Sequence, residues 1–133
     1  MIVVDAGVVA TALIDDELDG AAARQRLRGA RLAAPELLDL EVLSIMRRLL
    51  AAETLTPARA EQAIDDLVDF RIQRAPHRPL VARSWELRHN LSPYDAAYVA
   101  LAEALDTTLL TADARLGQAP GPTCAIEVLT PNR

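Results

Sequence analysis

The stretch Met1-Ile2-Val3-Val4-Asp5 opens the chain with a short β-branched run that stops at an acid. A run that is apolar at consecutive positions predicts a strand buried on both faces, as in a parallel sheet. Further strands are expected after it, and the segments between them carry helical patterns. Strands that alternate with helices predict an α/β sandwich around a mostly parallel sheet. The expected strands after the first are at 31–34, 107–111 and 125–129, with a brief one within 70–75.

The predicted helices begin at recognisable residues. Pro35 is expected to open one, Thr56-Pro57 reads as an N-cap and first turn, and Ser92-Pro93 starts another. The length of 133 residues fits a single domain over 1–133, and no internal repeat or linker divides it. The expected helices are at 8–13, from the acids at 15–19 to about 28, at 35–52, 56–70, 80–89 and 92–105.

Several absences exclude whole classes of chemistry. All 14 basic residues are arginine, so mechanisms that need a lysine ammonium are excluded, including those of receiver domains and aspartyl phosphatases. The single cysteine, Cys124, allows no intramolecular disulfide and no thiolate zinc site. Two histidines are too few for a histidine-rich metal site. No signal peptide or long apolar segment occurs, which predicts a cytoplasmic protein with no membrane contact.

The net charge of −5 argues against a nucleic-acid partner, because basic proteins neutralise phosphate best. That argument weakens if some of the 19 acids hold divalent cations. With only 3% aromatic residues, a base-stacking platform is not expected. The arginines gather at 24–31 and 71–78, where they either contact phosphate or form a solvated face that balances nearby acids.

Two acids come directly after predicted strands. Asp5 ends the first strand and Asp113 follows the strand at 107–111. Ligands of open parallel sheets bind outside the carboxyl ends of the strands, so these acids are candidates for one site if their strands are neighbours. The simpler alternative is that each caps the helix that follows it.

Two further acids lie on predicted helices. Glu41 shares a helical stripe with apolar residues, so it needs a partner, which could be a cation, Ser44 or Arg48. Asp95 falls three residues after Ser92, as in a capping box, and a helix N-terminus also keeps a carboxylate ionised. Together with Asp5 and Asp113 they form an all-oxygen set, which suits Mg²⁺ or Mn²⁺.

At these residues the chain resembles PIN-domain ribonucleases, and specifically VapC-type toxins of toxin–antitoxin pairs. The resemblance covers nearly the whole chain, and its last two blocks are specific in order and spacing. Its blocks are Ile2-Val3-Val4-Asp5, Leu40-Glu41-Val42-Leu43-Ser44 with Arg47-Arg48 behind, Leu91 to Ala102 and Leu109 to Leu116.

The resemblance implies a three-layer α/β/α sandwich and a metal-dependent endoribonuclease. Its acidic tetrad would be Asp5, Glu41, Asp95 and Asp113, binding Mg²⁺ or Mn²⁺, and Thr111 matches a hydroxyl residue that supports the acids. An RNA substrate, a homodimer and inhibition by a cognate VapB-type antitoxin are implied as well. The family usually has Ser or Thr two residues after the first aspartate, where this chain has Gly7.

Two functions other than that of a nuclease compete as explanations of the sequence. A receiver or phosphatase-like domain needs a lysine and an Asp-x-Asp motif, and Asp5-Ala6-Gly7 does not provide the motif. A PIN-like domain that binds RNA or protein without cutting stays possible because of Gly7. The helix at 35–52 is apolar almost all round, so we expect it to contribute to a dimer, unless the monomer buries every side of it.

Overall fold

The computed structural model describes residues 1–130 and contains one five-stranded sheet, in the order β3-β2-β1-β4-β5 with every neighbouring pair parallel. The expected α/β fold with a mostly parallel sheet is therefore confirmed. Val3 lies opposite Ala33 on one side and Leu109 on the other, so β1 is the central strand. The strands are β1 (Ile2–Val4), β2 (Leu32–Pro35), β3 (Gln73–Ala75), β4 (Leu109–Thr111) and β5 (Ile126–Val128).

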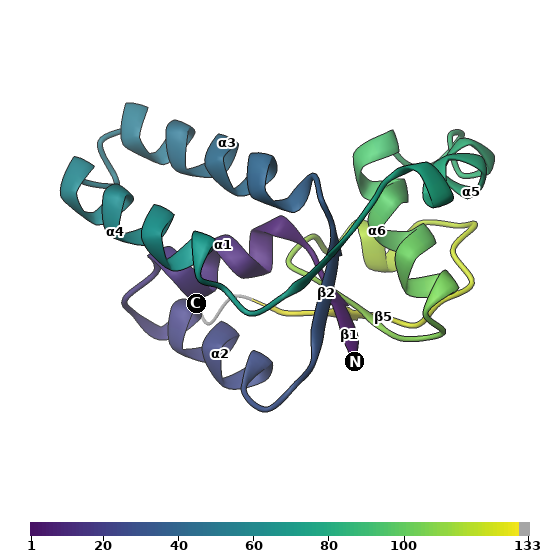
Figure 1. Cartoon of the computed structure of the whole chain (residues 1–133), viewed down its shortest axis with the longest axis horizontal. Helices are drawn as coiled ribbons and strands as arrows, with labels where there is room; N and C mark the ends of the chain where they lie inside the picture. Colours follow the sequence, from purple (N-terminus) through teal and green to yellow (C-terminus); the bar gives the residue numbers. More distant parts are fainter. Residues whose placement is uncertain (131–133) are drawn as a thin grey trace.

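The helices form the two outer layers of the sandwich. Figure 1 shows α1 to α4 on one side of the strands, with α5 and α6 on the other. Helix α6 packs on β1, β2 and β4, and α1 contacts β4 together with the helices α2, α3 and α4. The helices are α1 (Ala6–Ile14), α2 (Leu18–Leu27), α3 (Leu38–Ala51), α4 (Pro57–Val68), α5 (Val81–Glu86) and α6 (Pro93–Ala104), with 3-10 turns η1 (Arg78–Leu80) and η2 (Leu116–Gln118).

The two central strands are the most buried part of the sheet. Val3, Val4, Leu109 and Leu110 are fully buried, and each such side chain contributes about 1.5–3 kcal/mol. This burial explains why the first residues read as an unbroken apolar run. It also fixes the carboxyl ends of β1 and β4 side by side, which is where Asp5 and Asp113 follow them.

Two predicted helix boundaries were wrong. Pro35 does not open a helix but ends β2, and α3 begins at Leu38. Pro35 pairs with Ala75 of β3 and lies beyond the residues of β2 that pair with β1, so its missing N–H leaves no ladder bond unmade. The helix predicted at 80–89 is shorter, because α5 ends at Glu86 and a 3-10 turn precedes it.

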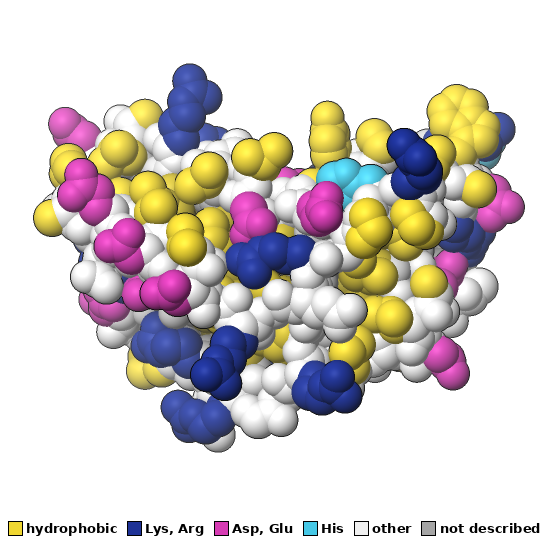
Figure 2. Space-filling view, viewed as in Figure 1, with side chains coloured by type: hydrophobic (Ala, Val, Ile, Leu, Met, Phe, Trp, Pro, Cys, Tyr) yellow, Lys and Arg dark blue, Asp and Glu magenta, His cyan; other side chains and the backbone are white. Residues whose placement is uncertain are grey.

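The surface is hollowed between the two groups of helices. Figure 2 shows acidic side chains beside an arginine and a histidine side chain in the middle of this face, with apolar side chains on either side. In the described part of the chain, no helix has the length and apolar character needed to cross a membrane.

Candidate active site

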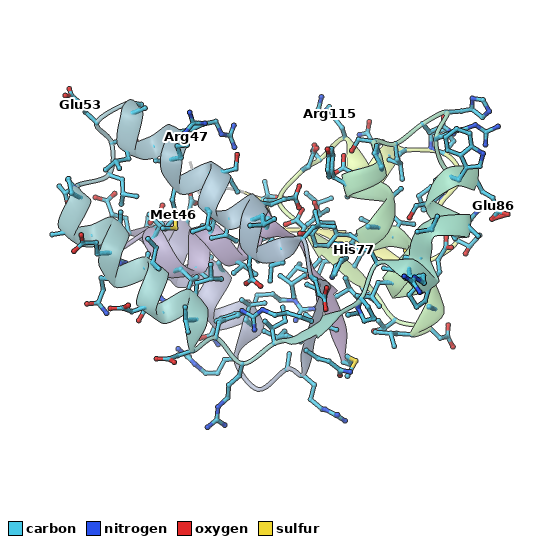
Figure 3. All side chains as sticks on the ribbon, turned by 45° about the horizontal axis from the view of Figure 1, so that its top comes forward. Met46, Arg47, Glu53, His77, Glu86 and Arg115 are labelled. Atoms are coloured by element: carbon cyan, nitrogen blue, oxygen red, sulfur yellow. The ribbon has the colours of Figure 1, made fainter. Side chains whose placement is uncertain are left out.

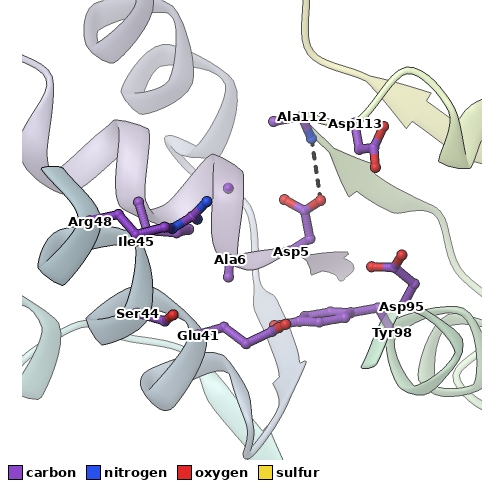
Figure 4. Close-up of a pocket in the computed structure, with 11 residues that line it drawn as sticks. Asp5, Ala6, Glu41, Ser44, Ile45, Arg48, Asp95, Tyr98, Ala112 and Asp113 are labelled. Carbon is purple, nitrogen blue, oxygen red and sulfur yellow. Dashed lines mark hydrogen bonds between the residues drawn. The ribbon is translucent and has the colours of Figure 1, made fainter. Parts of the chain in front are cut away.

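Four acids line one cavity of about 500 Å³ at the carboxyl ends of the central strands. Asp5 follows β1, Asp113 lies two residues after β4, Glu41 lies on α3 and Asp95 lies in the first turn of α6. Figure 4 shows Asp5 between the other three, with α3 and α6 on opposite sides of it. The four candidate residues from the sequence thus come from four separate elements and face the same space.

Asp5 is held by hydrogen bonds from two directions. Its Oδ1 accepts from the backbone N–H of Val8 at 3.0 Å, which makes Asp5 the N-cap of α1. Its Oδ2 accepts from the Ala112 N–H at 3.3 Å and from the Thr111 hydroxyl. The capping alternative therefore holds for Asp5, but it accounts for only one of the two carboxylate oxygens. The other oxygen is held by the residues that end β4.

Thr111 connects two of the acids. Its side chain is fully buried; the hydroxyl donates to Asp5, and its oxygen also accepts from the backbone N–H of Asp113 at 3.0 Å. A buried hydroxyl with a donor and an acceptor partner has little rotational freedom, so it fixes both neighbours. Gly7 lies close by, and a Cβ there would come within 3.2 Å of the Ala112 Cβ. A side chain at this position would require Ala112 to shift.

Glu41 has a protein partner that differs from those expected from the sequence. Its Oε1 accepts a hydrogen bond from the Tyr98 hydroxyl at 2.7 Å, whereas Ser44 and Arg48 were the expected protein partners beside a cation. Ser44 and Arg48 do line the cavity, one and two turns along α3. The only sequence signal for Tyr98 was its place three residues after Asp95, on the same side of α6.

Asp95 and Asp113 also have local structural roles. The Asp95 N–H donates to the Ser92 hydroxyl at 3.1 Å, which confirms the predicted N-cap. Asp113 accepts from the Arg115 backbone N–H at 2.9 Å and pairs with the Arg115 guanidinium at 3.2 Å. The Arg115 side chain is 92% exposed and extends outward from the loop after β4, as Figure 3 shows.

Burial and like charge act on three of these acids in the same direction. Burial raises the pKa of Asp5, Glu41 and Asp95, and repulsion from neighbouring acids of the set raises each further. Hydrogen bonds from Thr111, Tyr98 and Ser92 oppose this shift without cancelling it. Asp113 differs, because Arg115 holds its pKa below the usual range.

The donor set fits a hard divalent cation. It consists of four carboxylates that line one cavity, and three of them, Asp5, Glu41 and Asp95, are partly desolvated and repelled by other acids of the set. Within residues 1–130 no three His, Cys, Asp or Glu side chains converge closely enough to form a ligand shell as they stand. The four acids therefore fit a divalent cation in the type of their ligand atoms and in lining one cavity. Within residues 1–130 they are not close enough together to surround the ion.

Three of the seven arginines in the two clusters hold other parts of the fold. Arg24 donates to the carbonyls of Ala12 and Asp15, while Arg26 pairs with Glu127 at 2.7 Å and Arg74 with Asp39 at 2.8 Å. Arg28, Arg31, Arg71 and Arg78 are exposed. Arg26 and Arg74 therefore balance acids, as the second of the two predictions for these clusters expects, whereas Arg24 binds backbone carbonyls, which neither prediction included.

This fold and cavity define a class of α/β domain that gathers carboxylates at the centre of a parallel sheet. A family model described as "PIN domain" matches residues 2–122, and the chain belongs to the PIN-domain family. It is 42% identical over 128 residues to Ribonuclease VapC1 of Mycobacterium tuberculosis, covering 96% of both chains. It is 43% identical over 129 residues to Ribonuclease VapC9 of the same organism, covering 97% of this chain and 98% of that one.

Solved structures agree on the fold. FitAcB from Neisseria gonorrhoeae superposes with a TM-score of 0.65 at 16% identity, covering 97% of this chain and 98% of that chain. VapBC2 from Rickettsia felis, bound to a DNA fragment from its promoter, superposes with a TM-score of 0.64 at 15% identity, covering 96% and 98%. The expected PIN-like sandwich is thereby confirmed.

Proposed function

We propose that this protein is a VapC-type endoribonuclease that hydrolyses RNA in the cavity lined by Asp5, Glu41, Asp95 and Asp113. The observation that carries the proposal is that these four acids, from four separate elements, face one cavity of about 500 Å³ at the carboxyl edge of the sheet. The full-length similarity to relatives named VapC ribonucleases supports it.

The four acids would hold Mg²⁺ or Mn²⁺. Such an ion supplies an activated water and neutralises charge on the phosphodiester. The chain itself contributes carboxylates of fixed direction, since Thr111 restrains both Asp5 and the backbone of Asp113. In the reaction, the oxygen of water would bond to phosphorus, the bond between phosphorus and the 3′ oxygen would break, and a proton from the water would pass to that oxygen, which leaves a 5′-phosphate and a 3′-hydroxyl. The substrate would be a single-stranded site in a structured transfer, ribosomal or messenger RNA of the cytoplasm.

Arg48 supports an anionic substrate in this acidic cavity. Among the described residues that line it, Arg48 is the only cation. A guanidinium binds phosphate through paired donors, so it can contact the RNA backbone beside the acids. Figure 4 shows its side chain reaching toward the cavity from α3.

The alternative is a PIN-like domain that binds RNA or protein without cutting. Gly7 and the open arrangement of the acids favour it. The two functions differ in one result, because only the nuclease yields new RNA ends.

An antitoxin of VapB type is the proposed protein partner. A second cavity of about 830 Å³ adjoins the acids, and Gly7, Ile45, Arg48 and Ala112 line both. A C-terminal segment of the partner would lie in this groove and insert an arginine among the acids. Its affinity should then fall with salt and with Mg²⁺, and unchanged affinity in both titrations would contradict insertion at the acids.

A homodimer is proposed from the exposed apolar side chains near the cavity. Leu38, Val42 and Met46 of α3 are buried in the monomer, but Leu40 of the same helix is 71% exposed. On the other group of helices, Trp85 of α5 and Tyr94 of α6 are also exposed, and both line an apolar depression. Exposed apolar patches of this kind mark protein contacts. Light scattering at micromolar concentration should give twice the chain mass, and a monomer mass would refute the dimer.

The most informative experiment expresses the protein without its antitoxin and sequences the RNA 5′ ends that appear. We expect a small set of new 5′-phosphate ends that are absent when the Asp5→Asn variant is expressed. Binding of RNA without new ends, equal for both proteins, would favour the non-cutting alternative.

A further inference from the structure

We propose that Tyr98 is the positioning residue for Glu41, and that its hydroxyl holds this carboxylate in the direction needed for metal binding. The inference rests on the proposed function of Glu41 as a metal ligand. It assigns a role to a buried side chain that lines the cavity but supplies no carboxylate.

The contact joins the two sides of the cavity. Tyr98 lies on α6 and Glu41 on α3, 57 residues apart in sequence, and the phenol oxygen lies 2.7 Å from Oε1. Tyr98 is only 2% exposed and packs in the core, so its ring has little freedom to move. Figure 4 shows the two side chains pointing toward each other along one wall of the cavity.

A neutral donor suits this task better than a cation. Glu41 is half-buried near Asp5 and Asp95, and both acids repel it. An arginine partner would hold the carboxylate but also offset its charge, as Arg115 does for Asp113. The phenol hydroxyl donates one hydrogen bond to one oxygen and leaves the negative charge and the second oxygen for a cation.

The position of Tyr98 on α6 links two of the acids. Asp95 and Tyr98 lie three residues apart, on neighbouring turns of one helix face. The same helix therefore carries one acid of the set and the group that orients another acid from the opposite side. The spacing between Glu41 and Asp95 depends on this hydrogen bond as well as on helix packing.

The test compares Tyr98→Phe with Tyr94→Phe. Both variants remove one phenol oxygen from α6, but Tyr94 is 61% exposed and lies outside the cavity. Mn²⁺ binding to the RNA-free protein, measured by electron paramagnetic resonance, should weaken about 10- to 100-fold in Tyr98→Phe. It should stay unchanged in Tyr94→Phe. With RNA present, Tyr98→Phe should need more metal for half-maximal cleavage and recover most of kcat at saturation.

A double-mutant cycle separates positioning from packing. In a Glu41→Gln background the Tyr98→Phe change should have no further effect on Mn²⁺ affinity, because the group it positions is gone. An equal loss in both backgrounds would mean a general packing effect and would overturn the proposal. So would wild-type affinity in Tyr98→Phe, while the nuclease function would stand. No Mn²⁺ binding by the wild type would instead overturn the proposed function, and the role of Tyr98 with it.

Discussion

The acids of the cavity differ in their surroundings from two acids elsewhere in the fold that are paired with arginines. Glu103 accepts from Arg83 at 2.6 Å and from the Thr123 N–H at 2.8 Å, and Glu127 accepts from Arg26 at 2.7 Å. These arginines hold the pKa of both glutamates below the usual range. In the cavity, burial and like charge raise the pKa of Asp5, Glu41 and Asp95.

This difference separates acids that stabilise the fold from acids that are available to a ligand. An ionised acid beside an arginine stabilises the folded protein. Ionised acids that are desolvated and close to one another destabilise it. Clusters of desolvated acids with raised pKa values are typical of functional sites, where activity requires them despite their cost in stability. Asp113 lies between the two sets, since it lines the cavity but pairs with the exposed Arg115.

The largest predicted effect is the loss of cleavage when a cavity acid is neutralised. Asp95→Asn should bring RNA cleavage to background, because an anionic ligand is lost while the backbone cap remains. Ser92→Ala should instead cost about 0.5–2 kcal/mol of unfolding free energy through the lost cap and still cleave RNA. Cleavage rates and thermal unfolding of both variants check this. Equal stability losses with full activity in both would reduce Asp95 to a capping residue.

The paired acids should show the reverse behaviour. Glu103→Gln should lower the free energy of unfolding by about 1–3 kcal/mol, since a hydrogen-bonded ion pair with Arg83 is broken. Its rate of RNA cleavage per folded molecule should stay at the wild-type value. Denaturant unfolding and a cleavage assay on the same sample measure both. A variant of Glu103 that loses cleavage but keeps its stability would contradict the division between the two sets.

A smaller effect is expected from the cation of the cavity. Arg48→Gln should weaken RNA binding and reduce the slope of log affinity against log salt by about 0.7, the value for one phosphate of a single strand. The matched control is Arg47→Gln, the neighbouring residue on α3, which does not line the cavity; Figure 3 labels it on that helix. Fluorescence anisotropy in the non-cutting Asp5→Asn background gives both slopes. Equal slopes for the two variants would remove Arg48 from the RNA site.

The smallest effect concerns pH, and its sign differs between the two sets. The pKa of Asp5 is raised in the folded state above 3.8. The free energy of unfolding of the metal-free protein should therefore fall as pH rises from 3.8 through the folded pKa. Asp5→Asn should therefore gain relative to wild type above about pH 4. The pKa of Glu103 is lowered below 4.5, so Glu103→Gln should be less stable than wild type at neutral pH, with the difference vanishing as pH falls through the folded pKa. Urea unfolding at several pH values with a chelator tests this, and parallel curves would refute it.

The sequence predicts those parts of the site that depend on local pattern. Asp5 was identified because an apolar run ends at it, and the Ser92 cap because Ser-Pro opens a helix. The prediction for Pro35 failed because proline suits both a helix start and a strand end, and only the pairing with Ala75 decides between them. The residues next to Pro35 therefore do not indicate whether it begins a helix or ends a strand.

The contacts that depend on distant segments could not be predicted in the same way. Glu41 and Tyr98 are 57 residues apart, and Arg26 and Glu127 are 101 apart. Nothing in the arginine cluster at 24–31 distinguishes Arg26, which is paired across the molecule, from Arg28, which reaches only Gln25. Tyr94 and Tyr98 likewise lie four residues apart on α6, but Tyr94 is 61% exposed and Tyr98 is 2% exposed. Their burial depends on how α6 packs against the rest of the fold.

We propose that the acids of the cavity form a metal-dependent ribonuclease site, and RNA cleavage across a metal titration measures whether they do. Purified wild type and Asp5→Asn are incubated with a structured RNA across a Mg²⁺ titration, with a chelator as the zero point. We expect cleavage by the wild type that rises with Mg²⁺ and disappears with the chelator, and no cleavage by Asp5→Asn at any Mg²⁺ concentration. Cleavage by Asp5→Asn at the wild-type rate, or wild-type cleavage that persists in the chelator, would contradict it.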